Sequence, residues 1–137
     1  MPTKISETVT AEWMREQVFL LRDHNNFPVV MTQPMGVSGA DLLPMSLLGC
    51  VMWDIVAILE KKRQKITSLR ASAESIRDPE PPWIFREIHL RYVLTGRDLQ
   101  EKQVQHAIEL SEEKYCSIYA TLRQVVKITS EHELFQV

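Results

Sequence analysis

The chain has 137 residues, of which 45% are hydrophobic and 25% are charged, as in ordinary globular proteins. This length suits one folding unit, and we expect residues 1–137 to form a single domain. Sixteen Lys and Arg residues against eighteen Asp and Glu give a net charge of -2, so no broad positive field attracts phosphates. The composition excludes disordered and disulfide-dense proteins and argues against nucleic acid as a partner.

Two segments bear on where the protein works. The first seventeen residues interleave polar and charged side chains and lack the apolar stretch of a secretory signal, so we expect a cytoplasmic protein. Residues 42–59 are as long as a minimal membrane span, but Pro44 and Asp54 interrupt them and no second apolar segment accompanies them. We interpret this segment as a buried helix and expect no membrane partner.

The first third of the chain alternates between short apolar runs and turns. Residues 8–14, 17–21 and 27–31 have the pattern of β-strands, and the sequence Asp-His-Asn-Asn at 23–26 has turn chemistry. We predict an N-terminal β-meander. Residues 33–39 are rich in Pro, Gly and Ser, which favours a loop before the apolar segment.

Two residues can begin the helix over the apolar segment. Ser38 as N-cap places Asp41 at the third helical position, but Pro44 then falls at the sixth and removes a hydrogen bond. Asp41 as N-cap places Pro44 at the third position, whose N–H has no partner within the helix. We therefore predict that Asp41 is the cap and that the helix runs to about Lys65.

The predicted helix is apolar on nearly every side up to Leu59. Such a helix must be covered all round, and a small chain has few elements for that purpose. We expect a partner subunit to supply part of the cover in an obligate oligomer. The basic residues that follow are interpreted as a solvated helix end, not a phosphate or membrane patch: Lys61, Lys62, Arg63 and Lys65.

The segment after the helix predicts a β-hairpin. Residues 69–74 alternate between apolar and polar side chains, residues 77–82 are a Pro-rich connection, and residues 83–94 are the return strand. His89 falls on the exposed face of that strand, where a surface role is expected. The residues predicted to face inward are Ile88, Leu90, Tyr92 and Leu94.

The last third predicts helices and a closing strand. Asp98 and Glu101 have capping-pair spacing for a helix that begins near Leu99, with a kink or restart near Ser111. A further helical piece then contains Cys116, and residues 125–130 form a strand. The order βββ-α-ββ-α-α-β is an α+β fold with helices grouped against antiparallel strands.

Few local motifs indicate chemistry. The sequence has no glycine-rich nucleotide loop, no H-E-x-x-H and no C-x-x-C, and its four histidines lack metal-ligand spacing, so no metal site is predicted. Cys50 and Cys116 lie far apart in a chain without an export signal, and we expect reduced thiols. Two such cysteines are most often core residues unless their surroundings indicate otherwise.

Residues 38–63, SGADLLPMSLLGCVMWDIVAILEKKR, resemble the central helix of the OsmC/Ohr superfamily of osmotically inducible and organic hydroperoxide resistance proteins. Residues 79–90, PEPPWIFREIHL, are similar to the family's second hairpin, and residues 114–122, KYCSIYATL, resemble the helix that carries its second cysteine. The sequence DIV-IL-K-R at 54–63 favours the OsmC-like subgroup. The resemblance implies an OsmC-like fold, with antiparallel sheets packed on a long central helix in an intertwined homodimer.

The resemblance also implies a thiol peroxidase that uses no metal or bound organic cofactor. Cys50 matches the peroxidatic cysteine, which becomes a sulfenic acid, and Cys116 matches the resolving cysteine, which condenses with it to a disulfide. A dithiol reductant, a lipoyl group in the Ohr branch, would then reduce the disulfide. Organic hydroperoxides are the implied substrates, with a pocket beside Cys50 made by Leu47, Met52, Trp53 and Asp54.

The thiolate at Cys50 needs a cation or hydrogen-bond donors, and its own helix begins too far away to supply them. The family takes an arginine from the N-terminal strands, held by a glutamate before the central helix. Arg15 and Arg22 are the candidate arginines. Ala40 stands at the position of the glutamate, so Asp41 either replaces it or only caps the helix.

Asp54 stands one turn after Cys50, where a carboxylate disfavours a thiolate unless an arginine bridges both groups. It could instead be a buried acid paired with a basic residue of the partner chain. Two main functions follow: a peroxidase acting through Cys50 and Cys116, or a non-catalytic OsmC-like dimer that binds a small apolar or thiol-containing ligand at its interface. A structural subunit of a larger assembly is a third.

Overall fold

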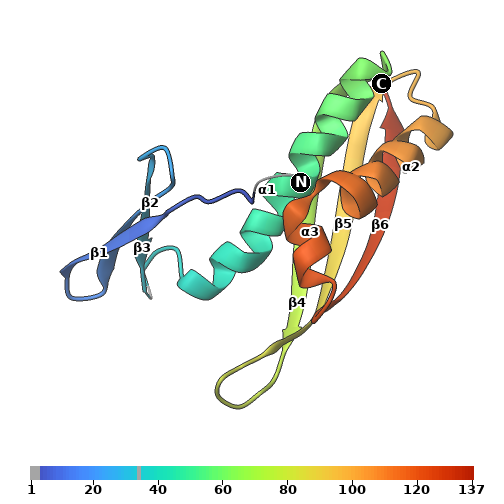
Figure 1. The fold of residues 1–137 in the computed structure, drawn as a ribbon. Helices are drawn as coiled ribbons and strands as arrows, with labels where there is room; N and C mark the ends of the chain where they lie inside the picture. The colour runs from blue at the N-terminus through green and yellow to red at the C-terminus, as the bar shows by residue number, and fades with distance from the viewer. Residues whose placement is uncertain (1–3, 34) are drawn as a thin grey trace. The chain divides into compact units, whose positions relative to one another are not determined.

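A computed structural model describes residues 4–33 and 35–137 (Figure 1). Within these residues the element order is the predicted βββ-α-ββ-α-α-β, with a π-helical turn between the last two helices. The α+β fold class is thus confirmed. Contacts divide the chain into two compact units, Met1–Leu43 and Pro44–Val137.

The first unit contains the predicted β-meander. Strands β1 (Thr10–Arg15), β2 (Val18–Arg22) and β3 (Pro28–Thr32) form an antiparallel sheet in the order β1-β2-β3. The predicted turn at 23–26 is closed by Asp23, whose Oδ1 accepts the backbone N–H groups of Asn25 and Phe27 at 2.9 and 2.8 Å. No described residue of these strands is fully buried, and β1 is exposed along its whole length.

The long helix α1 spans Gly39–Lys61. The prediction that Asp41 caps it is wrong, because Ser38 Oγ accepts the backbone N–H of Asp41 at 3.2 Å. Asp41 is therefore at the third helical position, and Pro44 lies inside the helix. A serine cap and an acidic residue in the first turn both stabilise a helix start, and together they offset the hydrogen bond that Pro44 removes.

The helix α1 ends four residues before the predicted Lys65. Arg63 adopts a φ of 59°, in the left-handed region, and Gln64 donates its N–H to the carbonyl of Leu59 at 2.9 Å. This is the geometry of a left-handed helix C-cap. The chain then enters a strand directly at Lys65.

The second unit contains a three-stranded sheet of β4 (Lys65–Arg77), β5 (Phe85–Arg97) and β6 (Lys127–Gln136), in the order β4-β5-β6. All three strands are longer than predicted. The pair β4–β5 is antiparallel, but β5–β6 is parallel, so the prediction of only antiparallel strands is wrong here. A parallel neighbour requires a crossover, which the intervening helices provide.

That crossover consists of α2 (Glu101–Leu110), the π-helical turn η1 (Ser111–Tyr115) and α3 (Ser117–Leu122). The predicted break near Ser111 is thus confirmed. The predicted Asp98 cap is wrong: Asp98 has a φ of 51°, and the N-cap is Gln100, which makes no side-chain cap. The Gln136 and Gln64 side chains accept the N–H groups of Leu99 and Gln100 instead, at 3.0 and 2.9 Å.

The core of the second unit lies between the helices and one face of the sheet (Figure 1). The four β5 residues predicted to face inward are all fully buried. They pack with one stripe of α1 and with α2, whose buried residues include Leu47, Val51, Ile55, Leu59, Val104, Ala107 and Ile108. His89, on the other face, contacts Thr129 and Glu131 on β6, as a surface strand histidine should.

Among the described residues, the second unit leaves other side chains of α1 exposed. Trp53 is 78% exposed and Met45 is 51% exposed. Among the described residues, α1 alone has the length and composition of a membrane span, a test that core helices of globular proteins also pass. The stripe that α1 contributes to the core favours the second explanation.

Candidate functional site

The two cysteines occupy different settings within the second unit. Cys50 lies near the middle of α1, half-buried, directly before the buried Val51. Cys116 is 1% exposed and is the N-cap residue of α3. Its N–H donates to the carbonyl of Ser111 at 2.8 Å, and its Sγ accepts the N–H of Tyr119 at 3.3 Å.

The structure brings these two thiols together. The pKa of the Cys116 thiol is raised to about 12, mainly by burial and secondly by the neighbouring side chain of Cys50. Cys116 therefore keeps its proton at neutral pH and can donate it to the sulfur of Cys50. Residues separated by 66 positions in the sequence thus form one reduced pair of free thiols.

The turn η1 fixes Cys116 from two sides. Ser111, fully buried, donates its hydroxyl to the carbonyl of Val51 at 2.8 Å, which joins the turn to the helix of Cys50. Glu112, 7% exposed, accepts hydrogen bonds from Tyr92 Oη at 2.7 Å and from Ser130 Oγ at 3.1 Å. These bonds join the turn to β5 and β6.

Burial raises the pKa of the Glu112 carboxyl, and the hydrogen bonds from Tyr92 and Ser130 oppose that rise. Burial also holds the pKa of Tyr92 well above its usual range, and the charge of Glu112 adds to this effect. Burial is also the main cause that raises the pKa of Tyr119 on α3. A cluster of shifted groups beside a thiol pair is typical of functional sites.

The residues predicted to form the substrate pocket are divided among three places. Asp54 lines a cleft of about 520 Å³ between α1 and the α2–η1 segment, together with Ala57, Ile58, Lys61, Lys62, Leu110 and Tyr115. Met52 and Trp53 line a separate groove of about 430 Å³ along α1 with Gly49. Leu47 is fully buried in the core.

The predicted activating residues all lie in the first unit. Arg15 is exposed at the end of β1, and Arg22 at the end of β2 donates from Nη1 to the carbonyl of Asn26 at 3.0 Å. Asp41 is exposed in the first turn of α1. Among the described residues, no lysine or arginine side chain hydrogen-bonds either cysteine sulfur.

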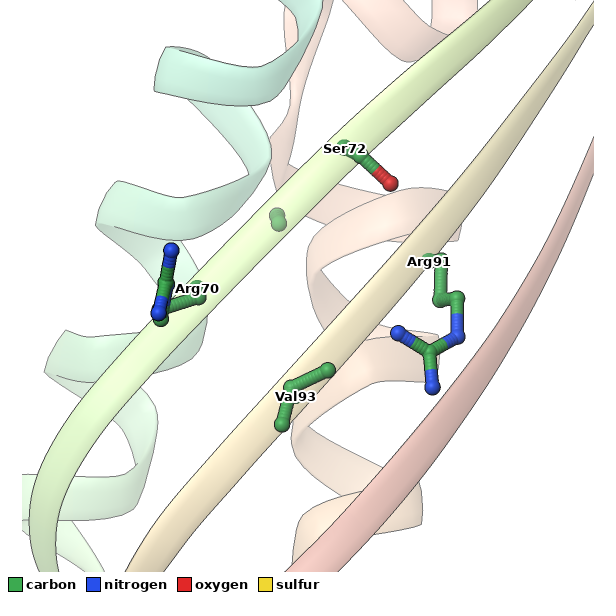
Figure 2. Close-up of a pocket in the computed structure, with 5 residues that line it drawn as sticks. Arg70, Ser72, Arg91 and Val93 are labelled. Atoms are coloured by element: carbon green, nitrogen blue, oxygen red, sulfur yellow. The ribbon is translucent and has the colours of Figure 1, made fainter.

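Two arginines of the second unit face away from the thiols. Arg70 and Arg91 line a groove of about 330 Å³ with Ser72 and Val93 on β4 and β5 (Figure 2). This is the sheet face opposite the core, because the alternate residues of both strands point to the helices. Arg91 is also paired with Glu133 at 2.6 Å. The sheet thus separates these guanidinium groups from Cys116.

Groups that could bind a metal ion are absent from the described part of the chain: no three His, Cys, Asp or Glu side chains come together there. The site offers thiol chemistry, supported by a buried carboxyl and a buried phenol. Ser111 and Glu112 are site residues that the sequence patterns did not indicate. Glu112 follows Ile108 by four positions, where helical spacing calls for an inward-facing residue, and this was the available signal.

The family model described as OsmC-like protein matches residues 32–131. The chain belongs to the OsmC-like protein family. Protein YhfA of Escherichia coli K12 is 33% identical over 126 residues, which are 90% of this chain and 94% of YhfA. The family match confirms the resemblance found in the helix of Cys50 and the segment of Cys116.

Solved structures agree with this assignment. A hypothetical protein from Aquifex aeolicus VF5 has a TM-score of 0.88 at 27% identity, over 98% of this chain and 99% of that one. The organic hydroperoxide resistance protein OhrB of Bacillus subtilis has a TM-score of 0.59 at 17% identity, over 94% of this chain and 98% of that one. The second likeness establishes a shared fold only.

Proposed function

We propose that this OsmC-like protein is a thiol peroxidase that reduces organic hydroperoxides through Cys50 and Cys116. The observation that carries the proposal is that the Cys50 side chain lies close enough to Cys116 to raise the pKa of its thiol, since a resolving cysteine must reach the peroxidatic one. A protein that only bound a ligand would not need this contact. The hydroperoxide resistance proteins among its structural relatives support the choice of substrate class.

The first step consumes the peroxide. The Cys50 thiolate attacks the terminal oxygen of the hydroperoxide, an S–O bond forms, and the O–O bond breaks. The alkoxide that leaves takes up a proton and departs as an alcohol. Cys50 is then a sulfenic acid, oxidised by two electrons.

The second step forms the disulfide. The sulfur of Cys116 attacks the sulfenic sulfur of Cys50, the S–S bond forms, and the S–O bond breaks. The leaving hydroxide takes the proton of Cys116 and departs as water. An external dithiol, for which a lipoyl group is our candidate, restores both thiols by two exchange reactions and becomes a disulfide itself.

Three further assignments complete the proposal. An arginine of the first unit, Arg15 or Arg22, supplies the cation that Cys50 needs, with Asp41 in place of the family glutamate. The enzyme works as a cytoplasmic homodimer, since dimers are typical of OsmC and Ohr proteins and much of α1 is uncovered in one chain. The apolar groove of Met52 and Trp53 and the cleft of Asp54 are the candidate contacts for the alkyl tail.

Mass spectrometry of single-equivalent oxidation tests the proposal. Reduced protein is treated with about one equivalent of cumene hydroperoxide, and we expect rapid loss of two hydrogens with a peptide crosslink between Cys50 and Cys116. In Cys116→Ser, dimedone should trap a sulfenic acid on Cys50. In Cys50→Ser, peroxide consumption should fall at least about 10³-fold, as for removal of other catalytic nucleophiles.

Unreacted thiols in the wild-type protein, or slow oxidation spread over methionines as well, would contradict the peroxidase. The ligand-binding dimer would then be the better account. If Cys50→Ser consumed peroxide as fast as the wild type, Cys50 would be excluded as the nucleophile.

A further inference from the structure

Glu112 is a buried carboxyl that the peroxidase chemistry described above does not use. It lies on the π-helical turn η1, four residues before Cys116, and is 7% exposed. Within the described residues it has no ion pair with a basic side chain. A buried acid without a cation is costly, so its presence beside the thiol pair requires an explanation.

The hydrogen bonds of Glu112 show what it holds in place. Tyr92 Oη on β5 donates to Oε2 at 2.7 Å, and Ser130 Oγ on β6 donates to Oε1 at 3.1 Å. Tyr92 is itself fully buried, so its hydroxyl has no access to water as an alternative partner. Glu112 therefore ties the turn to two adjacent strands of the sheet.

The neighbouring Ser111 ties the same turn to α1. Its hydroxyl donates to the carbonyl of Val51, the residue next to Cys50, at 2.8 Å. Its own carbonyl accepts the N–H of Cys116 at 2.8 Å, which is the bond that closes the π-turn. The backbone of Cys116 is thus connected through one turn to the helix of Cys50 and to the sheet. Single-turn π-helices are frequent at functional sites.

From this geometry we infer that Glu112 is a positioning residue, whose bonds to Tyr92 and Ser130 hold Cys116 against Cys50 for disulfide formation. The inference rests on the proposed redox role of the cysteine pair. Glu112 touches neither the peroxide nor a reacting sulfur in this account. Its removal should slow the step that joins the two sulfurs and leave the attack of Cys50 on peroxide unchanged.

The first measurement separates the two steps. For Glu112→Ala we expect disulfide formation to slow at least about 10-fold, while formation of the dimedone-trapped Cys50 sulfenic acid stays within about 2-fold of wild type. Glu112→Gln should restore the disulfide rate to within about 3-fold, because an amide oxygen can accept from Tyr92 and the amide nitrogen can donate to Ser130 Oγ. The matched control is Glu113→Ala, which removes the exposed neighbouring carboxylate and should change neither rate.

The second measurement needs no peroxide. Each variant is equilibrated with mixtures of reduced and oxidised dithiothreitol, and the fraction of Cys50–Cys116 disulfide gives the equilibrium constant for closing the pair. We expect Glu112→Ala to lower this constant about 10-fold, which is about 30 mV in the potential of a two-electron couple. Should Glu112→Ala not fold, Tyr92→Phe removes only the hydroxyl bond and should lower the constant about 3-fold.

The outcomes distinguish the inference from the proposed function. An unchanged equilibrium constant in Glu112→Ala or Tyr92→Phe overturns the positioning role, even if the wild type reduces peroxide. Equal loss of both kinetic steps in Glu112→Ala, or failure of Glu112→Gln to restore the disulfide rate, also overturns it. A wild type that forms the disulfide with dithiothreitol but ignores peroxide refutes the peroxidase and leaves the positioning of the pair supported.

Discussion

The two units of the chain each contain a three-stranded sheet, but only one of them has a core. Within residues 4–33 and 35–137, every fully buried apolar residue belongs to the second unit, where helices cover one face of the β4-β5-β6 sheet. The first unit has no buried residue among those described, and it exposes large apolar side chains that include Trp13, Phe27 and Val30. A small sheet without a covered face is marginally stable in water.

The proposed catalytic groups are therefore divided between a unit that has its own core and a unit that has none. The thiol pair and its supporting turn lie in the unit that packs on itself, whereas Arg15, Arg22 and Asp41 lie in the unit that needs cover from outside itself. The redox pair should therefore tolerate changes in assembly better than the activating groups do.

The largest effect is expected for the subunit contact of α1. Wild-type protein should have twice the 15.9 kDa chain mass in solution, and Trp53→Ala should weaken dimerisation by about 2–4 kcal/mol, since Trp53 is 78% exposed in one chain and buried tryptophans dominate interfaces. Sedimentation equilibrium measures both. The control is Trp83→Ala, in the connection between β4 and β5, which should leave the dimer intact. A wild type that is monomeric at micromolar concentration would contradict the proposed dimer.

A smaller effect, about 10- to 100-fold, is expected for the activating arginine. Among the described residues the Arg15 guanidinium has no hydrogen bond or ion pair, whereas the Arg22 guanidinium donates to the carbonyl of Asn26. We expect Arg15→Gln to slow formation of the Cys50 sulfenic acid more than Arg22→Gln does, as measured by stopped-flow consumption of cumene hydroperoxide. Neither variant should change the dithiothreitol equilibrium of the thiol pair. Full activity of both variants would mean that another group activates Cys50.

The sequence predicted the elements of the fold better than their ends. Period-2 and helical spacing identified the strands, the inward face of β5 and the break near Ser111, because these patterns follow directly from burial. The caps failed for a different reason. Ser38 and Asp41 are both good N-cap residues, and the destabilising effect of Pro44 inside the helix was smaller than predicted. At the start of α2, the side chains of two glutamines distant in sequence accept the backbone N–H groups, and Asp98 does not.

The site was predictable only in part, for related reasons. The motif around Cys50 and the segment around Cys116 revealed the family, but no periodicity could show that the two thiols meet. The partners of Glu112 are 20 and 18 residues away on different strands, and β6 pairs in parallel, which local spacing did not indicate. The role of Arg15 or Arg22 depends on how the first unit is placed against the thiols, which local sequence patterns do not indicate.

The smallest effect concerns the pH dependence of stability in the second unit. Burial raises the pKa of Glu112 in the folded protein above its unfolded value, so its contribution to stability is fully present below about pH 4.5 and is lost as the pH rises through the folded pKa. Glu112→Gln replaces the titrating carboxyl by a neutral amide. The charges of Glu113 and Glu109, which raise the pKa of Glu112, then no longer affect stability through this position. In urea unfolding of the reduced protein, the stability of wild type relative to Glu112→Gln should therefore fall as the pH rises above about 4.5, by about 2 kcal/mol or less. Parallel stability curves for the two proteins would show that Glu112 has the same protonation in the folded and unfolded states, and would remove the electrostatic reason for regarding this buried acid as costly.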